Sequence, residues 1–296
     1  MAAHDREDIV LAGASGRVGR LLRRAWSVAP GPGAGIVSTA RRPGPGALAW
    51  DPLEAPGALP RLLAGRASRV AAMVVLTGIT PGPGARLDLN APLARGSLDG
   101  ARAAGIERVL FASSAAVYGP GGGRRPFSEQ DPPAPATAYG AAKRDAEAEV
   151  ARFRDLGMEV AILRIGNVLG ADALMRSAEN ATPDAPLALD RFASGHGPVR
   201  SYIGPLGLAR VIAALAMHPG PLPDLLNVAA PEPVAMEDLL QAAGVPWRWT
   251  PAPGGAQERV TQDCARLTAL LPGLPLAETA AAMVAEGAAL PPLPAA

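Results

Sequence analysis

The sequence predicts an α/β fold in which helices cover both faces of a parallel sheet. Short apolar stretches alternate with helical stretches along residues 1–170, as in repeated βα units. A glycine-rich turn follows the first apolar stretch, and polar residues stand directly after later ones. The carboxyl ends of parallel strands meet at one edge of a sheet, where ligands bind. We therefore expect a single site at that edge.

The first predicted strand covers residues 8–12, and the first predicted helix covers residues 20–28. Between them stands a G-x-x-G-x-x-G turn. Glycines let the backbone approach a pyrophosphate closely, and the helix N-terminus offers free N–H groups to that anion. The turn predicts a Rossmann-type sheet that binds a dinucleotide, although a tight packing turn is the simpler alternative. The predicted contacts are Gly13, Ser15, Gly16, Arg17, Val18 and Gly19.

The second predicted strand, residues 34–40, ends without the acidic residue that holds the ribose 2′-hydroxyl of NAD. Arg41 and Arg42 follow it instead, and guanidinium groups pair well with a 2′-phosphate. This pattern favours NADP over NAD as the cofactor. The alternative is that two exposed arginines merely solvate a loop.

The later elements follow from the same reading of apolar runs and breaks. Residues 171–198 are polar and irregular, which is typical of a loop over a substrate. Further strands are predicted at residues 47–52, 69–76, 106–112 and 226–230, a strand with its following loop at residues 158–170, and helices at residues 88–104, 138–155, 206–217 and 234–243. We expect residues 1–170 to form the dinucleotide-binding domain and residues 171–296 a smaller substrate-binding region, whose chain returns to the sheet around residues 200–230.

Residues 106–143 carry the chemistry that the sequence predicts. Ser113 and Ser114 follow a buried strand, and Tyr139 and Lys143 stand four apart on one helix face. An ammonium near a phenol lowers its pKa, and such a tyrosine exchanges a proton with an alcohol or carbonyl oxygen. A serine hydroxyl can bond the same oxygen. The Tyr/Lys pair alone would more often be an ordinary surface feature.

A resemblance to a known family strengthens this interpretation. The sequence contains S-S-x-x-V-Y-G at residues 113–119, then Glu129, Asp131 and Pro132, and then Y-x-x-x-K. Together these resemble the active-site stretch of extended short-chain dehydrogenases/reductases, the NAD(P)-dependent epimerase/dehydratase family. Ser114 stands 25 positions before Tyr139, which is the spacing in that family. The resemblance covers nearly the whole chain and is most specific over residues 8–170.

The resemblance implies a role for each site residue. Tyr139 would exchange the proton, Lys143 would hold the nicotinamide ribose, and Ser114 would polarise the reacting oxygen while hydride moves to or from nicotinamide C4. The other implied contacts are Asp51 to the adenine, unless it caps a helix; Thr77 and Gly78 beside the cofactor; Ser113 and Asn167 to the substrate; and Arg200 to a phosphate of a nucleotide-sugar substrate.

Departures from the family pattern limit the reaction. Ala115 and Ala116 replace the acid pair of the sugar-nucleotide dehydratases, which argues against a dehydratase. The arginine expected about ten residues before Asp263 is absent, which weakens the case for a nucleotide-sugar. We expect an NAD(P)-dependent oxidoreductase or epimerase of a sugar-like substrate, with reduction and epimerisation both open. The alternative is a non-catalytic NAD(P)-binding sensor or scaffold protein.

Composition narrows the partners. The net charge is +1 and no charge-free apolar run reaches about 18 residues, so we expect neither a nucleic-acid surface nor a membrane span. The single Cys264 excludes an internal disulfide framework, and no metal site is predicted. These features favour a cytoplasmic protein with a small-molecule substrate. The family resemblance adds a homodimer that pairs through the helix of residues 138–155.

Overall fold

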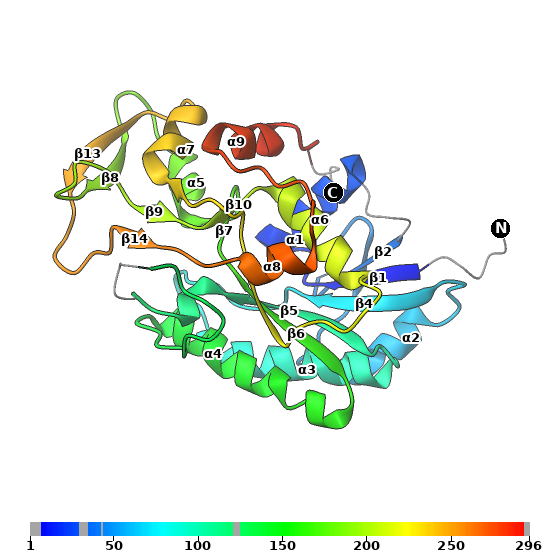
Figure 1. Cartoon of the computed structure of the whole chain (residues 1–296). Helices are drawn as coiled ribbons and strands as arrows, with labels where there is room; N and C mark the ends of the chain where they lie inside the picture. Colours follow the sequence, from blue (N-terminus) through cyan, green and yellow to red (C-terminus); the bar gives the residue numbers. More distant parts are fainter. Residues whose placement is uncertain (1–6, 30–34, 43, 121–124, 293–296) are drawn as a thin grey trace.

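The computed structural model describes residues 7–29, 35–42, 44–120 and 125–292. Its centre is a seven-stranded parallel sheet with the order β11-β6-β5-β4-β1-β2-β3 (Figure 1). The chain begins in the middle and winds outward both ways, so the predicted doubly wound α/β fold is confirmed. The strands are β1 (Glu7–Ala12), β2 (Gly35–Ala40), β3 (Ala47–Ala49), β4 (Arg69–Val75), β5 (Arg108–Ser114), β6 (Glu159–Ile165) and β11 (Leu225–Val228).

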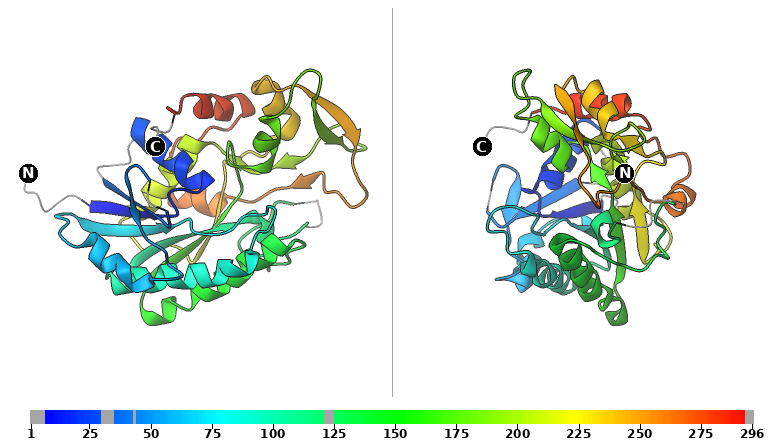
Figure 2. Two further views of the ribbon diagram at one scale, coloured as in Figure 1. Left: turned by 180° about the vertical axis from the view of Figure 1, so that it is seen from behind. Right: turned by 90° about the vertical axis from the view of Figure 1, so that its left-hand side faces the viewer.

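Helices cover both faces of the sheet (Figure 2). Helices α1 (Arg17–Val28) and α6 (Pro205–Ala216) pack on one face, and α3 (Asn90–Ala103) and α4 (Ala138–Ala151) on the other. Successive residues of β1 supply the two cores in alternation, because strand side chains point to opposite faces. Ile9 and Leu11 belong to the α1/α6 core, and Val10 to the α3/α4 core. This two-sided burial explains the continuous apolar runs of the sequence.

The remaining elements gather beyond the carboxyl edge of the sheet around a third core (Figure 1). They include α5 (Ala173–Ala178), β7 (Asn167–Val168), β8 (Leu187–Arg191), β9 (Val199–Arg200), β10 (Tyr202–Ile203), β12 (Val234–Ala235), α7 (Met236–Ala242), β13 (Trp247–Pro251), β14 (Arg259–Val260) and α9 (Ala280–Ala288), with α2 (Leu59–Leu63) and α8 (Ala265–Leu270) elsewhere. Helix α6 and strand β11 return to the sheet between these segments. The domain boundary at residue 170 stays a prediction.

Several predicted elements differ from the structure in content or bounds. Residues 171–198 are not irregular throughout, because they contain α5 and β8. Strand β8 pairs with β13 about 60 residues later, so its hydrogen-bond partner leaves no local pattern in the sequence. Strand β5 runs two residues further than expected, and Ser113 and Ser114 are its last two residues, paired with β6. Among the described helices, none has the length and apolar character needed to cross a membrane.

Candidate active site

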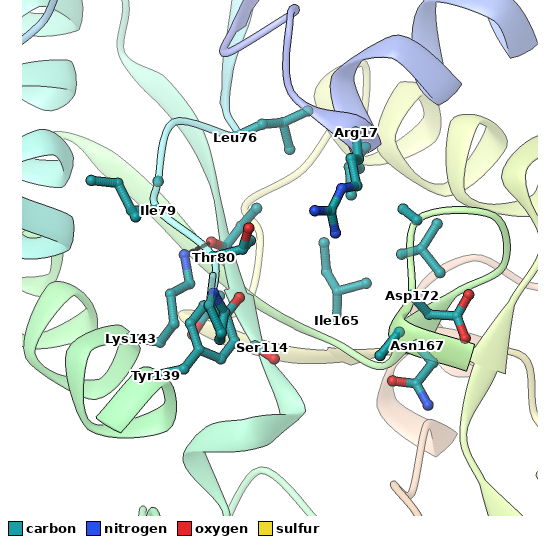
Figure 3. A pocket seen from close by; sticks show the side chains of 18 of the residues that line it. Arg17, Leu76, Ile79, Thr80, Ser114, Tyr139, Lys143, Ile165, Asn167 and Asp172 are labelled. Carbon is teal, nitrogen blue, oxygen red and sulfur yellow. Dashed lines mark hydrogen bonds between the residues drawn. The ribbon is translucent and has the colours of Figure 1, made fainter. Parts of the chain in front are cut away.

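A cleft of about 420 Å³ opens along the carboxyl edge of the sheet. Its walls come from the turn after β1, the loop after β4, the end of β5, the start of α4 and the turn after β6. Figure 3 shows Tyr139, Ser114 and Lys143 on one side, Asn167 and Asp172 on the other, and Arg17 reaching in from the glycine-rich turn. The sheet therefore brings together segments that the sequence separates by 150 residues or so.

The glycine-rich turn has the close approaches that a dinucleotide site requires. Gly13 has a φ of +86°, a conformation that only glycine adopts readily. A side chain at Gly19 would meet the Gly13 carbonyl oxygen at 2.5 Å, so α1 packs directly against the turn. Helix α1 begins at Arg17, earlier than predicted, and no acidic residue occupies its first turn. Its N-terminus is therefore free to face an anion.

A hollow of about 150 Å³ adjoins this turn, between the ends of β1, β2 and β4. It is lined by Gly13, Ser15, Gly16, Thr39, Ala40, Arg41, Trp50, Leu76, Thr77, Gly78 and Leu93. Trp50, which the sequence analysis did not assign, stands in this hollow, whereas its neighbour Asp51 does not. The Asp51 carboxylate instead accepts a hydrogen bond from the Leu53 backbone N–H at 2.9 Å. In the structure, Asp51 therefore stabilises the local turn that follows β3.

Arg42 lies in a second hollow, of about 170 Å³, together with Arg20 and Arg23 from α1. Arg23 donates a hydrogen bond to the Pro45 carbonyl oxygen at 2.6 Å, which ties α1 to the segment after β2. No acidic side chain lines either hollow among the described residues. The sequence analysis missed Arg20 and Arg23, because their proximity to Arg42 depends on the α1–β2 packing.

The loop after β4 is fixed in place by Asn90 at the start of α3. The Asn90 side chain accepts from the Ile79 backbone N–H at 3.0 Å and donates to the Ile79 and Leu87 carbonyl oxygens. Asn90 is buried and lines the cleft. Thr77 also bonds Ser97 on α3 through the two hydroxyls, at 2.9 Å. These bonds fix the loop that carries Thr77 and Gly78, of which Gly78 lines the cleft and both line the hollow beside the glycine-rich turn. Their contact with the cofactor stays a prediction.

Helix α4 presents Tyr139 and Lys143 to the end of β5. The Thr137 side chain caps the helix by accepting from the Gly140 N–H at 3.0 Å. A side chain at Gly140 would meet the Ala116 carbonyl oxygen, so the first turn of α4 packs against the loop that follows Ser114. Ser114 Oγ accepts from the Ala116 N–H at 3.2 Å and faces the cleft. The three predicted catalytic side chains therefore lie together.

The ionisation of this group differs from the sequence-based expectation. Burial raises the pKa of Tyr139 above its usual range, and the Ser114 hydroxyl opposes that rise. The Lys143 ammonium donates to the Ala112 carbonyl oxygen at 2.6 Å, and the effect of burial on the phenol is the larger one. Burial lowers the pKa of Lys143 to about 8, and the Glu147 carboxylate opposes that change. At neutral pH Tyr139 therefore holds its proton and Lys143 carries a charge.

A buried ion pair lies directly behind these residues, and the sequence analysis did not identify it. Arg164 on β6 makes two hydrogen bonds to Glu147 on α4, at 3.1 and 2.8 Å. Both side chains are less than 10 % exposed. Ser113, predicted to contact substrate, donates its hydroxyl to Glu147. The Ser113 side chain thus joins β5 to α4. Ser113 is also one of the residues that line the cleft.

Asn227 at the end of β11 links the catalytic loop to the last third of the chain. It is fully buried, donates to the Phe127 and Asp263 carbonyl oxygens, and accepts from the Tyr118 hydroxyl at 2.7 Å. Tyr118 in turn stacks on Phe127, with ring centroids 4.8 Å apart. The loop after β5 is therefore held by contacts from residues more than 100 positions away.

The structure gives the two other predicted substrate residues different surroundings. Asn167 lines both the cleft and an inner cavity of about 360 Å³ beside Tyr139. Arg200 also lines the inner cavity, but its guanidinium donates to the Val199, Gln257 and Glu258 carbonyl oxygens at 2.8–2.9 Å. Those backbone contacts take three of the five N–H donors of the guanidinium, so Arg200 is held mainly by its own backbone surroundings. No cluster of potential metal ligands occurs among the described residues.

Residues 70–207 match the model of the NAD dependent epimerase/dehydratase family. This segment includes the whole stretch from β4 to the start of α6, and so it contains Ser114, Tyr139, Lys143 and Asn167. The resemblance that the sequence motifs indicated is thereby confirmed. No curated protein matches the chain.

Several solved structures share the fold over nearly the whole chain. MoeE5 in complex with UDP-glucuronic acid and NAD is 22% identical, with a TM-score of 0.74, over 95% of this chain and 99% of that chain. A short-chain dehydrogenase/reductase superfamily protein from Agrobacterium tumefaciens with bound NAD is 23% identical, with a TM-score of 0.74, over 95% and 96%. UDP-glucose 4-epimerase from Brucella ovis in complex with NAD is 19% identical, with a TM-score of 0.75, over 94% and 96%.

Proposed function

The segment that carries the site matches the NAD dependent epimerase/dehydratase family, and from this premise we propose that the chain is an NAD(P)-dependent oxidoreductase or epimerase acting on a sugar-like substrate. One observation carries the proposal: Ser114, Tyr139 and Lys143 lie together in the cleft into which the glycine-rich turn opens. The residues also fit a dinucleotide, since close backbone packing at Gly19 and the free N-terminus of α1 suit a pyrophosphate. The carbon that reacts is a carbinol or carbonyl carbon.

Each side chain then has a defined task. Bound nicotinamide supplies or accepts the hydride. Tyr139 holds its proton at neutral pH, because burial raises its pKa, and donates that proton to the oxygen of a carbonyl substrate. Ser114 donates a hydrogen bond to the same oxygen and fixes its position. The charged Lys143 offers donors to the ribose hydroxyls, and a fixed cation beside the reacting oxygen stabilises developing negative charge.

We propose NADP as the preferred cofactor. β2 ends in Ala40-Arg41-Arg42 with no acid, and Arg41 and Arg42 line the two hollows beside the glycine-rich turn. A 2′-phosphate placed there would meet guanidinium groups, whereas a carboxylate that would select NAD is absent from the described lining residues. The solved structures above contain NAD, so the preference rests on this chain's own residues.

The direction of the reaction follows from how tightly the cofactor is held. The structures of similar fold include UDP-glucose 4-epimerases. If this chain shared their activity, it would epimerise its sugar. An exchangeable NADP would instead favour reduction, and we favour reduction because of the arginines at the end of β2. A homodimer through α4 and a cytoplasmic location remain predictions.

Titration of the purified protein with NADPH and NADH tests this proposal. We expect NADPH to bind at least tenfold more tightly, and Arg41→Ala to remove that preference while NADH affinity stays within about twofold. Arg102→Ala is a matched control, because Arg102 is an exposed arginine in the last turn of α3 and lines neither hollow. Tight co-purified NAD would contradict the NADP preference and favour an epimerase. Binding without turnover on any carbonyl substrate would favour the sensor alternative.

A further inference from the structure

The inner cavity beside Tyr139 contains two buried acceptor oxygens that lack a donor. They are Asp172 Oδ1 and Gln262 Oε1, and both residues line the cavity. Buried polar atoms in folded proteins almost always have a hydrogen-bond partner, so each such exception calls for one. Two such acceptors on the wall of one cavity can accept hydrogen bonds from donors that enter it, whether these belong to water or to a ligand.

The orientation of the Gln262 amide follows from its neighbours. Asn227 donates through Nδ2 to two backbone carbonyl oxygens, so its Oδ1 must be the acceptor. Gln262 Nε2 donates to that oxygen at 3.0 Å and to the Arg164 carbonyl oxygen at 2.8 Å. Turning the Gln262 amide over would place oxygen against oxygen at both contacts. Gln262 is only 5% exposed, and its Oε1 is therefore held as an unpaired acceptor.

Asp172 presents the second acceptor from the residue before α5. Its Oδ2 accepts from the Tyr202 hydroxyl at 3.0 Å, while Oδ1 has no partner. The backbone groups of Leu174 and Met175, in the first turn of α5, act to lower the pKa of Asp172. Neither of them donates a hydrogen bond to its carboxylate. Burial outweighs these contacts and raises the pKa of Asp172. A donor on Oδ1 would relieve that cost of burying the carboxylate.

The two acceptors disfavour an anion at this place. Arg200 is the one cation among the described lining residues, and both Nη1 hydrogens and one Nη2 hydrogen of its five N–H donors already bond backbone carbonyl oxygens. A carboxylate or phosphate placed against Asp172 and Gln262 would bring no donor to either acceptor and would face the like charge of Asp172. Hydroxyl groups can donate to both acceptors without that repulsion.

We propose that Asp172 and Gln262 bind hydroxyl donors of the substrate, and that the inner cavity therefore selects an uncharged hydroxylated ring over one that carries a carboxylate. The inference rests on the proposed function for the identity of the reacting centre. It adds two specificity residues and a charge requirement. It predicts that an uronic acid is rejected where the neutral sugar is accepted.

Binding to the protein saturated with NADPH tests this inference, with galactose, galacturonate, UDP-glucose and UDP-glucuronic acid as probes. We expect each probe with an uncharged ring to bind at least tenfold more tightly than its partner with a ring carboxylate, because that carboxylate would face Asp172 in place of a hydroxyl donor. Asp172→Asn keeps the size of the side chain but removes its charge, and we expect it to reduce this discrimination to under threefold. Asp238→Asn, an exposed acid on α7, is the matched control and should change neither affinity.

The outcomes separate this inference from the proposed function. Equal affinity for the neutral and acidic partners, discrimination that survives Asp172→Asn, or no binding of any probe would each overturn the inference. The cofactor titration is independent of the sugar probes. Failure of both dinucleotides to bind would overturn the proposed function, and the same probes without cofactor would then decide the charge preference of the cavity.

Discussion

Replacing Glu147 by Gln should destabilise the protein strongly, because Glu147 is buried and pairs with a buried arginine. Glu147 is 7% exposed and accepts from Arg164, at 3% exposure, and from Ser113. The substitution removes the negative charge and leaves the Arg164 guanidinium buried without its counter-ion. Breaking one side of a buried pair typically costs about 3–5 kcal/mol. Glutamine keeps one acceptor oxygen, so we expect the lower end, about 3 kcal/mol.

A thermal melt and a urea titration measure this loss. At about 2–4 °C per kcal/mol for chains approaching this length, the midpoint should fall by about 6–12 °C. Glu149→Gln is the matched control, because Glu149 stands on the same helix and pairs with Arg95 at the surface, at 2.8 Å. Exposed pairs contribute about 0–1 kcal/mol, so the control should melt within about 3 °C of the wild type. Equal midpoints for the two variants would refute the reasoning.

The same variant has a second expected effect, on Lys143. Glu147 opposes the burial that lowers the Lys143 pKa to about 8. Without that carboxylate the pKa should fall further, and Lys143 should lose its charge at a lower pH. The alkaline limb of NADPH affinity should therefore move to lower pH in Glu147→Gln and stay in place in Glu149→Gln. A merely structural role for Glu147 would leave the limb unmoved.

Three further predictions concern the cleft itself. Tyr139→Phe should reduce turnover about 10²–10⁴-fold while NADPH affinity stays within about threefold, as steady-state kinetics and titration would show; retained turnover would exclude Tyr139 as the proton donor. Gly19→Ala should weaken NADPH binding at least tenfold, because its Cβ would lie 2.5 Å from the Gly13 carbonyl oxygen, and unchanged affinity would contradict the predicted pyrophosphate site. As pH rises through about 8, Lys143 loses its proton, and NADPH affinity should fall. The free energy of unfolding should rise between about pH 8 and 10.4, because the unfolded chain still binds the proton that the folded chain has lost. Lys143→Met should flatten both pH profiles.

Most of the sheet was predictable because each strand is marked by a local pattern of apolar residues that ends in a turn. Strand β1 is apolar on both faces and runs directly into a glycine-rich turn, so strand, turn and helix could be recognised within residues 8–28. Ser114 and Tyr139 were recognised from one continuous stretch. Their meeting in the cleft required that Ser114 end a strand and that the first turn of α4 pack against the loop after that strand.

The parts that escaped prediction depend on residues far apart in the chain. Glu147 looks like one more polar residue on an Ala-rich helix, and only its pairing with Arg164 shows that it is buried. For Asp51 the structure shows the local bond to Leu53 that was the alternative to an adenine contact, and for Arg200 it shows bonds to backbone carbonyl oxygens that the motif did not indicate. The ligand contacts of both residues stay predictions. The raised pKa of Tyr139 has the same origin, since burial depends on tertiary packing and outweighs any effect of sequence spacing.

The bonds of Asn227 set an order of assembly for the active site. The serine, tyrosine and lysine have all been synthesised once residue 143 is reached, but the loop that joins them is tied down by Asn227, Gln262 and Asp263. A nascent chain that ends before residue 225 would contain every catalytic side chain but not the residues that hold the loop between them in place. Contacts of such long sequence separation slow folding, because closing a long loop costs entropy. The catalytic centre of this protein is therefore completed by residues that are synthesised after all of its catalytic side chains.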